Sequence, residues 1–507
     1  MGIGRVIGTN VMETRFRIDF EENLQVGELL VVESPTTNGK YLVRVMNIEH
    51  AADKDETNWM SRTAGMIMKK ETPDISPYAP YLFCVGVSSP LGFIDDASFK
   101  KTKTLPTHFA EVRYTQASDY EFLKPYLGNI EIGNLRSGDK ILDFPVGISE
   151  RAVPYHIGIF ATTGMGKSNL MKNLALSCMM KGDCGFLIFD PHGEYFDGGE
   201  LNKKGLKDSP YKESFAVYSS RDLSANGASY SKLIISSTEI EISDLEAIYE
   251  FTEAQKECLQ TAQYKYKEEW LNKLDELEVE RIVEDLKGYQ SGTIGVIKRR
   301  LSNLFRLNLI SKDRNYSVTA RIINQLHEGK TILVDTSNAH ETEELLISTV
   351  ISRAVFEKNK ALYSESEKFS KLPNTLIAIE EAQRVLKEAD DSVFAQIARE
   401  GRKFKTGLCA VSQQPKLIAN EVISQFNTLF ILGLSDKKDR EILKNSAKQD
   451  VSQVDNEIQM LMPGEAIVAS PFTPFAVPVK VHLYEERLKH LQVNKSSDQK
   501  KMDEGFF

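Results

Sequence analysis

Three features that mark other classes of protein are missing from this sequence of 507 residues. The five cysteines are scattered, with no Cys-x-x-Cys pair and no Cys/His cluster, which argues against a zinc site and against a disulfide framework. No apolar run approaches the roughly 18 residues that a membrane-spanning helix needs. The N-terminus also lacks the pattern of a signal peptide. We therefore expect a soluble, cytoplasmic protein with no membrane segment.

An excess of positive charge is missing as well. The chain has 63 Lys and Arg against 72 Asp and Glu, a formal net charge of -9. Proteins that coat nucleic acid with their outer surface are usually basic, because neutralising phosphate supplies most of the affinity. Any contact with DNA must therefore be local, such as a basic lining inside an otherwise acidic particle.

The pattern of apolar residues changes along the chain and predicts two domains. Residues 1–110 contain short β-rich runs separated by turn formers, a pattern that fits a small barrel or, equally, a two-sheet sandwich. Residues 111–155 are mixed and are expected to form a connector. Over residues 156–484, short apolar strands alternate with helices, which is typical of an α/β fold with a parallel sheet covered on both faces. Residues 240–312 read as a helical subdomain inserted into that sheet, and residues 485–507 as a short, polar tail.

Six strands of the parallel sheet are expected from their continuous apolar runs. These runs are His156–Phe160, Gly185–Phe189, Thr331–Val334, Leu376–Ile379, Gly407–Val411 and Thr428–Leu432.

The strongest chemical signal is a Walker A loop, Ala161-Thr-Thr-Gly-Met-Gly-Lys-Ser168. It follows an apolar strand and opens a helix, which is the context that such a loop requires. Its glycines let backbone N–H groups converge on phosphate oxygens, while Lys167 can reach the β- and γ-phosphates and the hydroxyl of Ser168 can ligate Mg²⁺. Ala161 replaces the usual first glycine, and a small residue should serve there. The residues expected to bind the nucleotide are Thr163, Gly164, Met165, Gly166, Lys167, Ser168 and Asn169.

Two further strand ends carry carboxylates. Glu380 and Glu381 follow the run Leu376–Ile379, and they suit the roles of Mg²⁺ ligand and of base for the attacking water. The same residues would also favour the start of a helix. Asp190 ends the strand after the Walker A helix, at an edge where ligands approach, although Asp-Pro is also a common way to begin a turn.

A basic segment and a glutamine complete the set of candidates. Arg399 and Arg402 lie in Arg-Glu-Gly-Arg-Lys, and an arginine there could stabilise the transferred phosphoryl group across a subunit interface. A solvated loop or a DNA contact is the commoner explanation of such a cluster. Gln413, after the next strand, could sense the γ-phosphate.

In this order and spacing the motifs resemble those of the HerA/FtsK superfamily, and of HerA more closely. The segments that carry the resemblance are HIGIFATTGMGKSN, FLIFDPHGEY, LIAIEEAQ, EGRKF and AVSQQP, after a strand-rich N-terminal segment. The resemblance covers nearly the whole chain. It implies a RecA-like P-loop NTPase core with a helical insertion and a HerA-type β-barrel at the N-terminus. It also implies a homo-hexameric ring around a channel wide enough for double-stranded DNA, with ATP and Mg²⁺ as cofactors.

The resemblance also assigns roles to the candidates. It makes Lys167 and Ser168 ligands of phosphate and Mg²⁺, Glu380 a helper at the metal and Glu381 the catalytic residue that activates water. It places Asp190 near the nucleotide, Gln413 as the sensor and Arg402 as the arginine acting in trans, with Arg399 in reserve. The chain departs from the family at Ala161, and at Gln383, where the family more often has His.

Two functions from different classes are expected. The first is an ATP-hydrolysing translocase on double-stranded DNA that works with a separate nuclease or defence effector at the barrel end, in phage defence or DNA-end processing. The chain has no nuclease motif of its own, and a basic channel lining would be needed. Lys298, Arg299, Arg300 and Arg306 are candidates for it, although a solvated helix face is the commoner explanation of such a run. The second is a hexameric ATPase scaffold that assembles and regulates an effector, which the acidic charge mildly favours.

Overall fold

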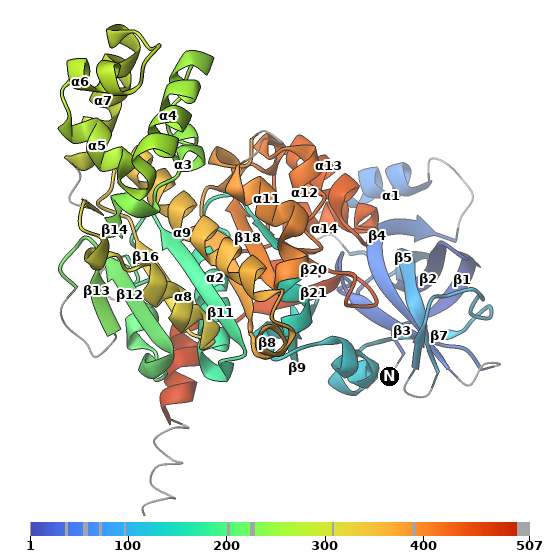
Figure 1. Ribbon diagram of the computed structural model, residues 1–507. Coiled ribbons are helices and arrows are strands. Elements are labelled where there is room, and N and C mark those ends of the chain that lie inside the picture. The colour runs from blue at the N-terminus through green and yellow to red at the C-terminus, as the bar shows by residue number, and fades with distance from the viewer. Residues whose placement is uncertain are drawn as a thin grey trace, which may run out of the picture.

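The computed structural model describes residues 2–35, 39–53, 59–69, 74–95, 98–199, 203–223, 229–306, 309–387 and 392–493. They form a β-domain at one end of the molecule and a larger α/β domain, from which a group of helices projects at the other end (Figure 1). No helix within these ranges is long and apolar enough to cross a membrane.

The N-terminal domain is a closed barrel of six antiparallel strands. The ring runs β1–β7–β3–β4–β5–β2 and closes where β2 pairs with β1, while β6 pairs only with β5. Leu30 and Val32 point into the barrel, whereas Leu29 and Val31 alternate with them and pack outward with the core of the next domain. Because the ring of strands is closed, the domain is a barrel and not the two-sheet sandwich that the sequence equally allowed. Its elements are β1 (Gly4–Asn10), β2 (Glu13–Asp19), β3 (Leu29–Glu33), β4 (Lys40–Ala52), α1 (Trp59–Ile67), β5 (Leu82–Asp95), β6 (Ser98–Lys100) and β7 (Glu111–Tyr114).

The stretch 111–155, expected to be a connector, contributes strands to both domains. Strand β7 completes the barrel, and η2 (Ala117–Tyr126) links it to the hairpin of β8 (Ile130–Ser137) and β9 (Lys140–Ile148). Strand β8 pairs antiparallel with β21 (Val477–Val481). The local sequence does not reveal this arrangement, because the partner strand lies about 340 residues away in the chain.

The α/β domain is built on one twelve-stranded sheet. Its order is β13–β12–β16–β11–β17–β18–β10–β19–β20–β21–β8–β9, and the strands from β13 to β19 are parallel. Each of the six expected runs forms a strand of this parallel part. The remaining strands are β10 (Ile157–Phe160), β11 (Cys184–Asp190), β12 (Phe215–Ser219), β13 (Ser229–Lys232), β16 (Thr331–Asp335), β17 (Asn374–Ile379), β18 (Thr406–Ser412), β19 (Thr428–Ile431) and β20 (Glu465–Ala469).

Helices cover both faces of the sheet, which explains why its strands are apolar throughout. Along β11, Phe186 and Ile188 face the layer that contains α2 (Lys167–Lys181), whereas Leu187 and Phe189 face the opposite layer. The helices on that second side or beyond it are α8 (Thr319–His327), α9 (Glu341–Leu362), α10 (Ser366–Lys371), α11 (Val393–Glu400), α12 (Asn420–Ile423), α13 (Lys437–Ser446) and α14 (Asp455–Met460).

The helical block expected over 240–312 is present and projects from the body (Figure 1). Leu271, Leu274, Ile282 and Leu286 are buried in it, as their spacing predicts. The block comprises α3 (Ile242–Glu246), α4 (Glu253–Tyr266), α5 (Trp270–Glu276), α6 (Val279–Asp285) and α7 (Ser291–Phe305), and the short strands β14 (Ile235–Ser236) and β15 (Ile310–Ser311) pair at its base.

The start of the expected C-terminal tail is ordered against the core. Residues 484–493 are helical, Leu488 is buried, and Arg487 donates to Ser177 and Asn173 on α2. The rest of the tail, 494–507, lies outside the described residues.

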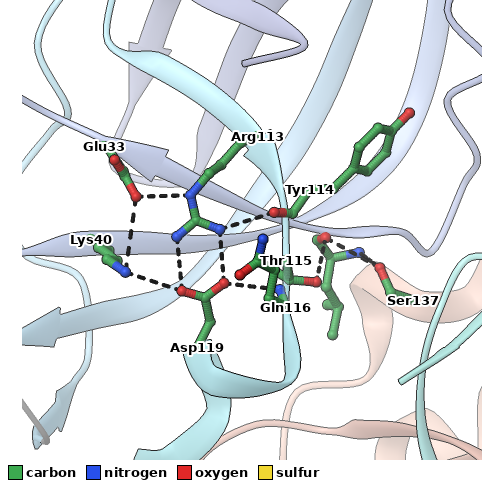
Figure 2. Close-up of polar contacts among 9 residues, drawn as sticks. Glu33, Lys40, Arg113, Tyr114, Thr115, Gln116, Asp119 and Ser137 are labelled. Carbon is green, nitrogen blue, oxygen red and sulfur yellow. Dashed lines mark hydrogen bonds and ion pairs between the residues drawn. The ribbon is translucent and has the colours of Figure 1, made fainter. Parts of the chain in front are cut away.

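Two sets of charged residues hold the barrel in place, the first by joining it to the linking segment η2 and the second by joining it to the α/β domain. We call the first, Glu33, Lys40, Arg113 and Asp119, the barrel-joint cluster (Figure 2). Arg113 donates two hydrogen bonds of 2.8 Å to Asp119 and one of 2.8 Å to Glu33, and Lys40 lies 3.1 Å from Asp119. Burial alone would raise the pKa of Asp119, but its hydrogen bonds from Arg113, the Gln116 amide and Lys40 outweigh burial and hold that pKa at about 2.

The second set is fully enclosed. Arg44 on β4 and Arg136 on β8 both contact Glu457 on α14, and Arg44 also donates to the carbonyl of Ala476. All three charged side chains are at most 4% exposed. Removing Glu457 would leave two buried guanidinium groups without a counter-charge, so this carboxylate fixes the barrel to this part of the core.

Candidate nucleotide-binding site

The Walker A segment has the backbone of a phosphate cradle. It runs from the end of β10 into α2, and Gly164 and Gly166 have φ values of +82° and +101°. Only glycine adopts these angles without strain, and Gly166 caps the helix whose N-terminus carries partial positive charge. Ala161 is fully buried beneath the loop, so its methyl group is accommodated where the pattern usually has glycine. Lys167 directs its ammonium group back to the carbonyl of Ala161, 3.4 Å away.

Four charged residues meet at this edge of the sheet, and we call Lys167, Glu194, Glu380 and Glu381 the nucleotide-edge cluster. Burial lowers the pKa of Lys167, and the three carboxylates oppose that shift. Burial raises the pKa of Glu380 to about 7, against a hydrogen bond from the hydroxyl of Tyr195 and the charge of Lys167. Within this cluster, the single positive charge of Lys167 therefore faces three carboxylates.

Glu381 is held in an unusual conformation. Its φ is +47°, in the left-handed region, which costs a residue with a side chain on the order of 1 kcal/mol or more. Both of its carboxylate oxygens accept hydrogen bonds from amides, at 2.6 Å from Gln383 and at 3.2 Å from Gln413. Gln383 is in turn fixed by the hydroxyl of Ser412 at 2.6 Å.

Gln413 also reaches the Walker A loop. Its side-chain oxygen accepts a hydrogen bond from the hydroxyl of Thr163, so a single amide connects the loop to Glu381. Strand β18 makes this possible, because it lies between β10 and β17 in the sheet and its end carries Gln413. The site residues expected from β17, β18 and the Walker A loop thus lie together.

Asp190 has a different position from the one expected of a nucleotide ligand. It is fully buried, and its two oxygens accept hydrogen bonds from the backbone N–H groups of residues 192–195, at 2.7 to 3.3 Å. Its carboxylate therefore shapes the loop after β11 and has no free face toward a ligand. Burial is the main cause that raises the pKa of Asp190 to about 6, and the hydrogen bonds from these N–H groups oppose the rise.

The loop that Asp190 shapes carries two residues that the sequence reasoning did not select. Glu194 accepts a hydrogen bond of 2.6 Å from the hydroxyl of Ser168, and Tyr195 donates to Glu380. Both belong to the segment DPHGEY, so the motif was visible, but its direct contacts depend on three strand ends converging.

Two of the expected ligands have other partners. The amide of Asn169 donates to the carbonyl of His482 and accepts from the N–H of Tyr484, which ties the P-loop helix to the C-terminal helical segment. The carbonyl of Met165 accepts from the N–H of Gly464. The Met165 side chain packs close to Gly433.

The arginines lie at the opposite edge of the sheet. Arg402 precedes β18, roughly 20 Å along that strand from the end that carries Gln413. It is exposed and stacks over the ring of Tyr155 at 4.0 Å. With Arg399, Glu400, Lys403 and Phe404 it lines an open hollow of about 630 Å³. Within one chain this arginine is too far from the Walker A loop to contact the same nucleotide.

The four basic residues of the helical block are not equivalent. Lys298 donates to the carbonyl of Leu277, and Arg300 donates to the carbonyl of Glu250 at 2.7 Å. Arg299 and Arg306 are exposed.

The donor set at the nucleotide edge fits Mg²⁺. Oxygen ligands suit this ion, and the hydroxyl of Ser168 lies beside the carboxylate of Glu194. Among the residues that the structure describes, no group of three or more His, Cys, Asp or Glu side chains is arranged to hold a metal ion. Phosphate oxygens of a nucleotide would therefore have to complete the site.

Comparisons with known proteins agree with this geometry. The family described as "Helicase HerA, central domain" matches residues 130–355. A "Probable helicase MJECL08" of Methanocaldococcus jannaschii is 24% identical, over 97% of this chain and 98% of its own length. The "DNA double-strand break repair helicase HerA" of Saccharolobus solfataricus is 26% identical, over 78% of this chain and 77% of its own.

Among solved structures, the plasmid coupling protein TrwB in complex with ADP and Mg²⁺ covers 67% of this chain and 88% of its own at 15% identity. The TM-score of this match is 0.47. The sequence relatives over nearly the whole length, the matched central domain and a Walker A loop facing paired carboxylates lead to one assignment. This chain is an ATP-hydrolysing enzyme of the helicase type and belongs to the HerA/FtsK superfamily of P-loop ATPases.

Proposed function

We propose that this protein is a motor that translocates double-stranded DNA by hydrolysing ATP, and that it works as a homo-hexameric ring. The observation that carries the proposal is the convergence of Lys167, Ser168, Gln413 and Glu381 at one edge of the sheet. The names of its relatives, which include DNA double-strand break repair helicases, support DNA as the substrate.

Each residue of the site has a role in this proposal. Lys167 and the backbone N–H groups of the Walker A loop bind the β- and γ-phosphates. Ser168 and Glu380 hold the metal side of the nucleotide, where bound Mg²⁺ would neutralise developing phosphate charge. Glu381 orients the attacking water and accepts its proton, and the two glutamine amides that fix its carboxylate keep it aimed.

Gln413 and Arg402 connect the chemistry to movement. Gln413 contacts both Thr163 and Glu381, so a γ-phosphate arriving between them would change its hydrogen bonds. Arg402 is exposed at the opposite edge of the sheet in its own subunit, and in the ring it contacts the nucleotide of a neighbouring subunit. Such an arginine stabilises charge on the transferred phosphoryl group. Arg399 is the reserve for this role.

DNA would pass through the ring, and a separate nuclease or defence effector would dock at the barrel end. Arg299 and Arg306 are the remaining candidates for a channel lining, since Lys298 and Arg300 already donate to carbonyl groups. Phage defence and DNA-end processing are both compatible with such a complex.

A second function, a hexameric scaffold that regulates an effector, has one observation in its favour. The chain is acidic, and two of the four expected basic residues are occupied. In this function ATP hydrolysis switches the assembly and DNA is not required.

The deciding measurement is the ATPase rate of the purified protein with and without linear double-stranded DNA. We expect DNA to raise the rate several-fold, and Glu381→Gln to lower it by on the order of 100-fold or more, because a positioned base contributes that much. Glu367→Gln is the matched control, since this exposed residue lies on α10 and forms an ion pair with Lys371 on the surface. A rate that is indifferent to DNA supports the scaffold, and full activity of Glu381→Gln contradicts the assignment of the base.

A further inference from the structure

We infer that Glu194 is the positioning residue that orients the hydroxyl of Ser168 toward Mg²⁺. From its position at the end of β17, Glu380 would otherwise be the expected residue for this task. The inference rests on the proposed function, because it concerns the metal that accompanies ATP. It assigns Glu194, in the loop after β11, as a necessary part of the ATP site.

The chemistry of a serine ligand requires such a partner. A hydroxyl that binds a metal ion does so through an oxygen lone pair, and its proton must then point elsewhere. An acceptor in that direction fixes the rotation of the side chain and makes the oxygen a better ligand. The Oε2 atom of Glu194 accepts a hydrogen bond from the hydroxyl of Ser168, with 2.6 Å between the two oxygens.

Glu380 is already engaged in another way. The hydroxyl of Tyr195 donates to its Oε1 atom, and Tyr195 is almost completely buried. Two neighbouring residues of one loop therefore contact the two motifs of the site, Glu194 the Walker A serine and Tyr195 the carboxylate at the end of β17. The loop sets the distance between these motifs.

The loop is rigid enough for this task. Asp190 ties down four successive N–H groups, including those of Glu194 and Tyr195. Gly193 turns the chain with a φ of +71°, and a Cβ atom there would lie 3.2 Å from Ser337.

The loop's support continues into the neighbouring strand. Ser337 donates to Asp335 at 2.7 Å, and the same carboxylate binds Arg221 at 2.6 Å. This platform keeps Glu194 in one place although its side chain is exposed.

The same hydrogen bond allows an opposite role, which the test must separate. If Glu194 only blocked Ser168 until a nucleotide displaced it, removing the carboxylate would strengthen binding of Mg²⁺. If Glu194 positions Ser168, its removal weakens binding of Mg²⁺ and leaves the metal-free contacts of the nucleotide intact.

The experiment measures binding of a fluorescent ADP analogue to the full-length protein, first in EDTA and then over a titration with Mg²⁺. Glu194→Ala removes the acceptor, Glu194→Gln keeps an acceptor oxygen without the charge, and Glu367→Gln is the remote control. We expect Glu194→Ala to raise the Mg²⁺ concentration at half-effect by about tenfold, the usual result of losing an outer partner of a metal ligand. Glu194→Gln should raise it less, and neither variant should change binding in EDTA.

An unchanged or lowered Mg²⁺ requirement in Glu194→Ala overturns the inference, and so does an equal loss of binding in EDTA. The Mn²⁺ electron paramagnetic resonance spectrum of the complex with ADP gives a second readout, expected to show more free Mn²⁺ in Glu194→Ala than in the control. Neither readout depends on turnover. A wild-type protein that binds Mg²⁺ and ADP but never hydrolyses ATP would therefore contradict the proposed function and leave this inference standing.

Discussion

The barrel-joint cluster and the nucleotide-edge cluster are made of the same kinds of side chain and differ in their balance of charge. In the barrel-joint cluster two cations face two carboxylates, and the pKa of Asp119 is held at about 2. In the nucleotide-edge cluster three carboxylates share Lys167, and the pKa of Glu380 rises to about 7. Burial raises the pKa of the carboxylate in both clusters, so burial alone does not explain why the two pKa values differ.

The difference shows how a structural and a functional cluster can be distinguished. The first is neutral in sum and complete in itself, because each carboxylate has a cationic donor. The second is held by neutral donors, a tyrosine hydroxyl and two glutamine amides, and keeps an excess of negative charge. An excess of that kind costs stability in the free protein and suits a cation that arrives with its substrate.

The largest effect on stability is expected from breaking the complete cluster. Arg113→Met keeps much of the side-chain volume but leaves Asp119 and Glu33 without their guanidinium, and should lower the free energy of unfolding by about 3 kcal/mol. Thermal and denaturant unfolding measure this, and the ATPase rate per folded molecule should stay near wild type. Arg5→Met is the matched control, because its ion pair with Glu111 is exposed and should contribute less than about 1 kcal/mol. Equal effects of the two substitutions would contradict the comparison.

A stabilising change of intermediate size is expected at the nucleotide edge. Because the pKa of Glu380 is raised from 4.5 to about 7, its charged form costs stability increasingly as pH rises through this range. Glu380→Gln can still accept from Tyr195, and should raise the free energy of unfolding by on the order of 2 kcal/mol at pH 8 and by almost nothing at pH 4.5.

The control for that sign is Asp119→Asn, which should destabilise at pH 8, since the pKa of Asp119 is lowered from 3.8 to about 2. Unfolding curves at the two pH values measure both variants. A Glu380→Gln protein that is less stable than wild type at pH 8 would show that the nucleotide edge is as complete as the barrel joint.

The smallest effect is expected in the loop after β11, which contacts the Walker A serine and the carboxylate at the end of β17. Gly193→Ala forces a side chain into a left-handed conformation, with its Cβ 3.2 Å from Ser337, and should cost about 1 kcal/mol. Gly8→Ala is the control, because a Cβ at Gly8 meets nothing within 4 Å. Melting temperatures compare the two, and a loss no larger in Gly193→Ala than in Gly8→Ala would mean that the loop adapts freely.

Much of the α/β domain could be predicted from the sequence because its signals are local. Apolar runs bounded by turns gave the strands of the parallel sheet, and the strand–glycine–helix context of residues 161–168 gave the phosphate cradle. Gln413 was expected after the next strand as a sensor of the γ-phosphate, but its hydrogen bond to Glu381 was not predicted.

Other features depend on partners that are distant in the chain. The closure of the barrel by residues 111–114 requires pairing with β1 and β3, and the hairpin of β8 and β9 requires β21. The partners of individual charged side chains could not be predicted from the sequence either. Asp190 proved to serve backbone N–H groups, and Arg300 a carbonyl across the helical block, because only the assembled fold decides which polar group meets which.

The extension of the sheet of the α/β domain by the β8–β9 hairpin has a practical consequence for the design of fragments of this protein. Between Tyr114, which ends the barrel, and Ile130, which begins β8, no strand is interrupted, and residue 130 is also where the matched central domain starts. A fragment begun at residue 156 would lose the hairpin and leave β21 as a bare, largely apolar sheet edge, open to self-association. The border at which the two domains can be separated therefore lies well before the first strand of the nucleotide fold.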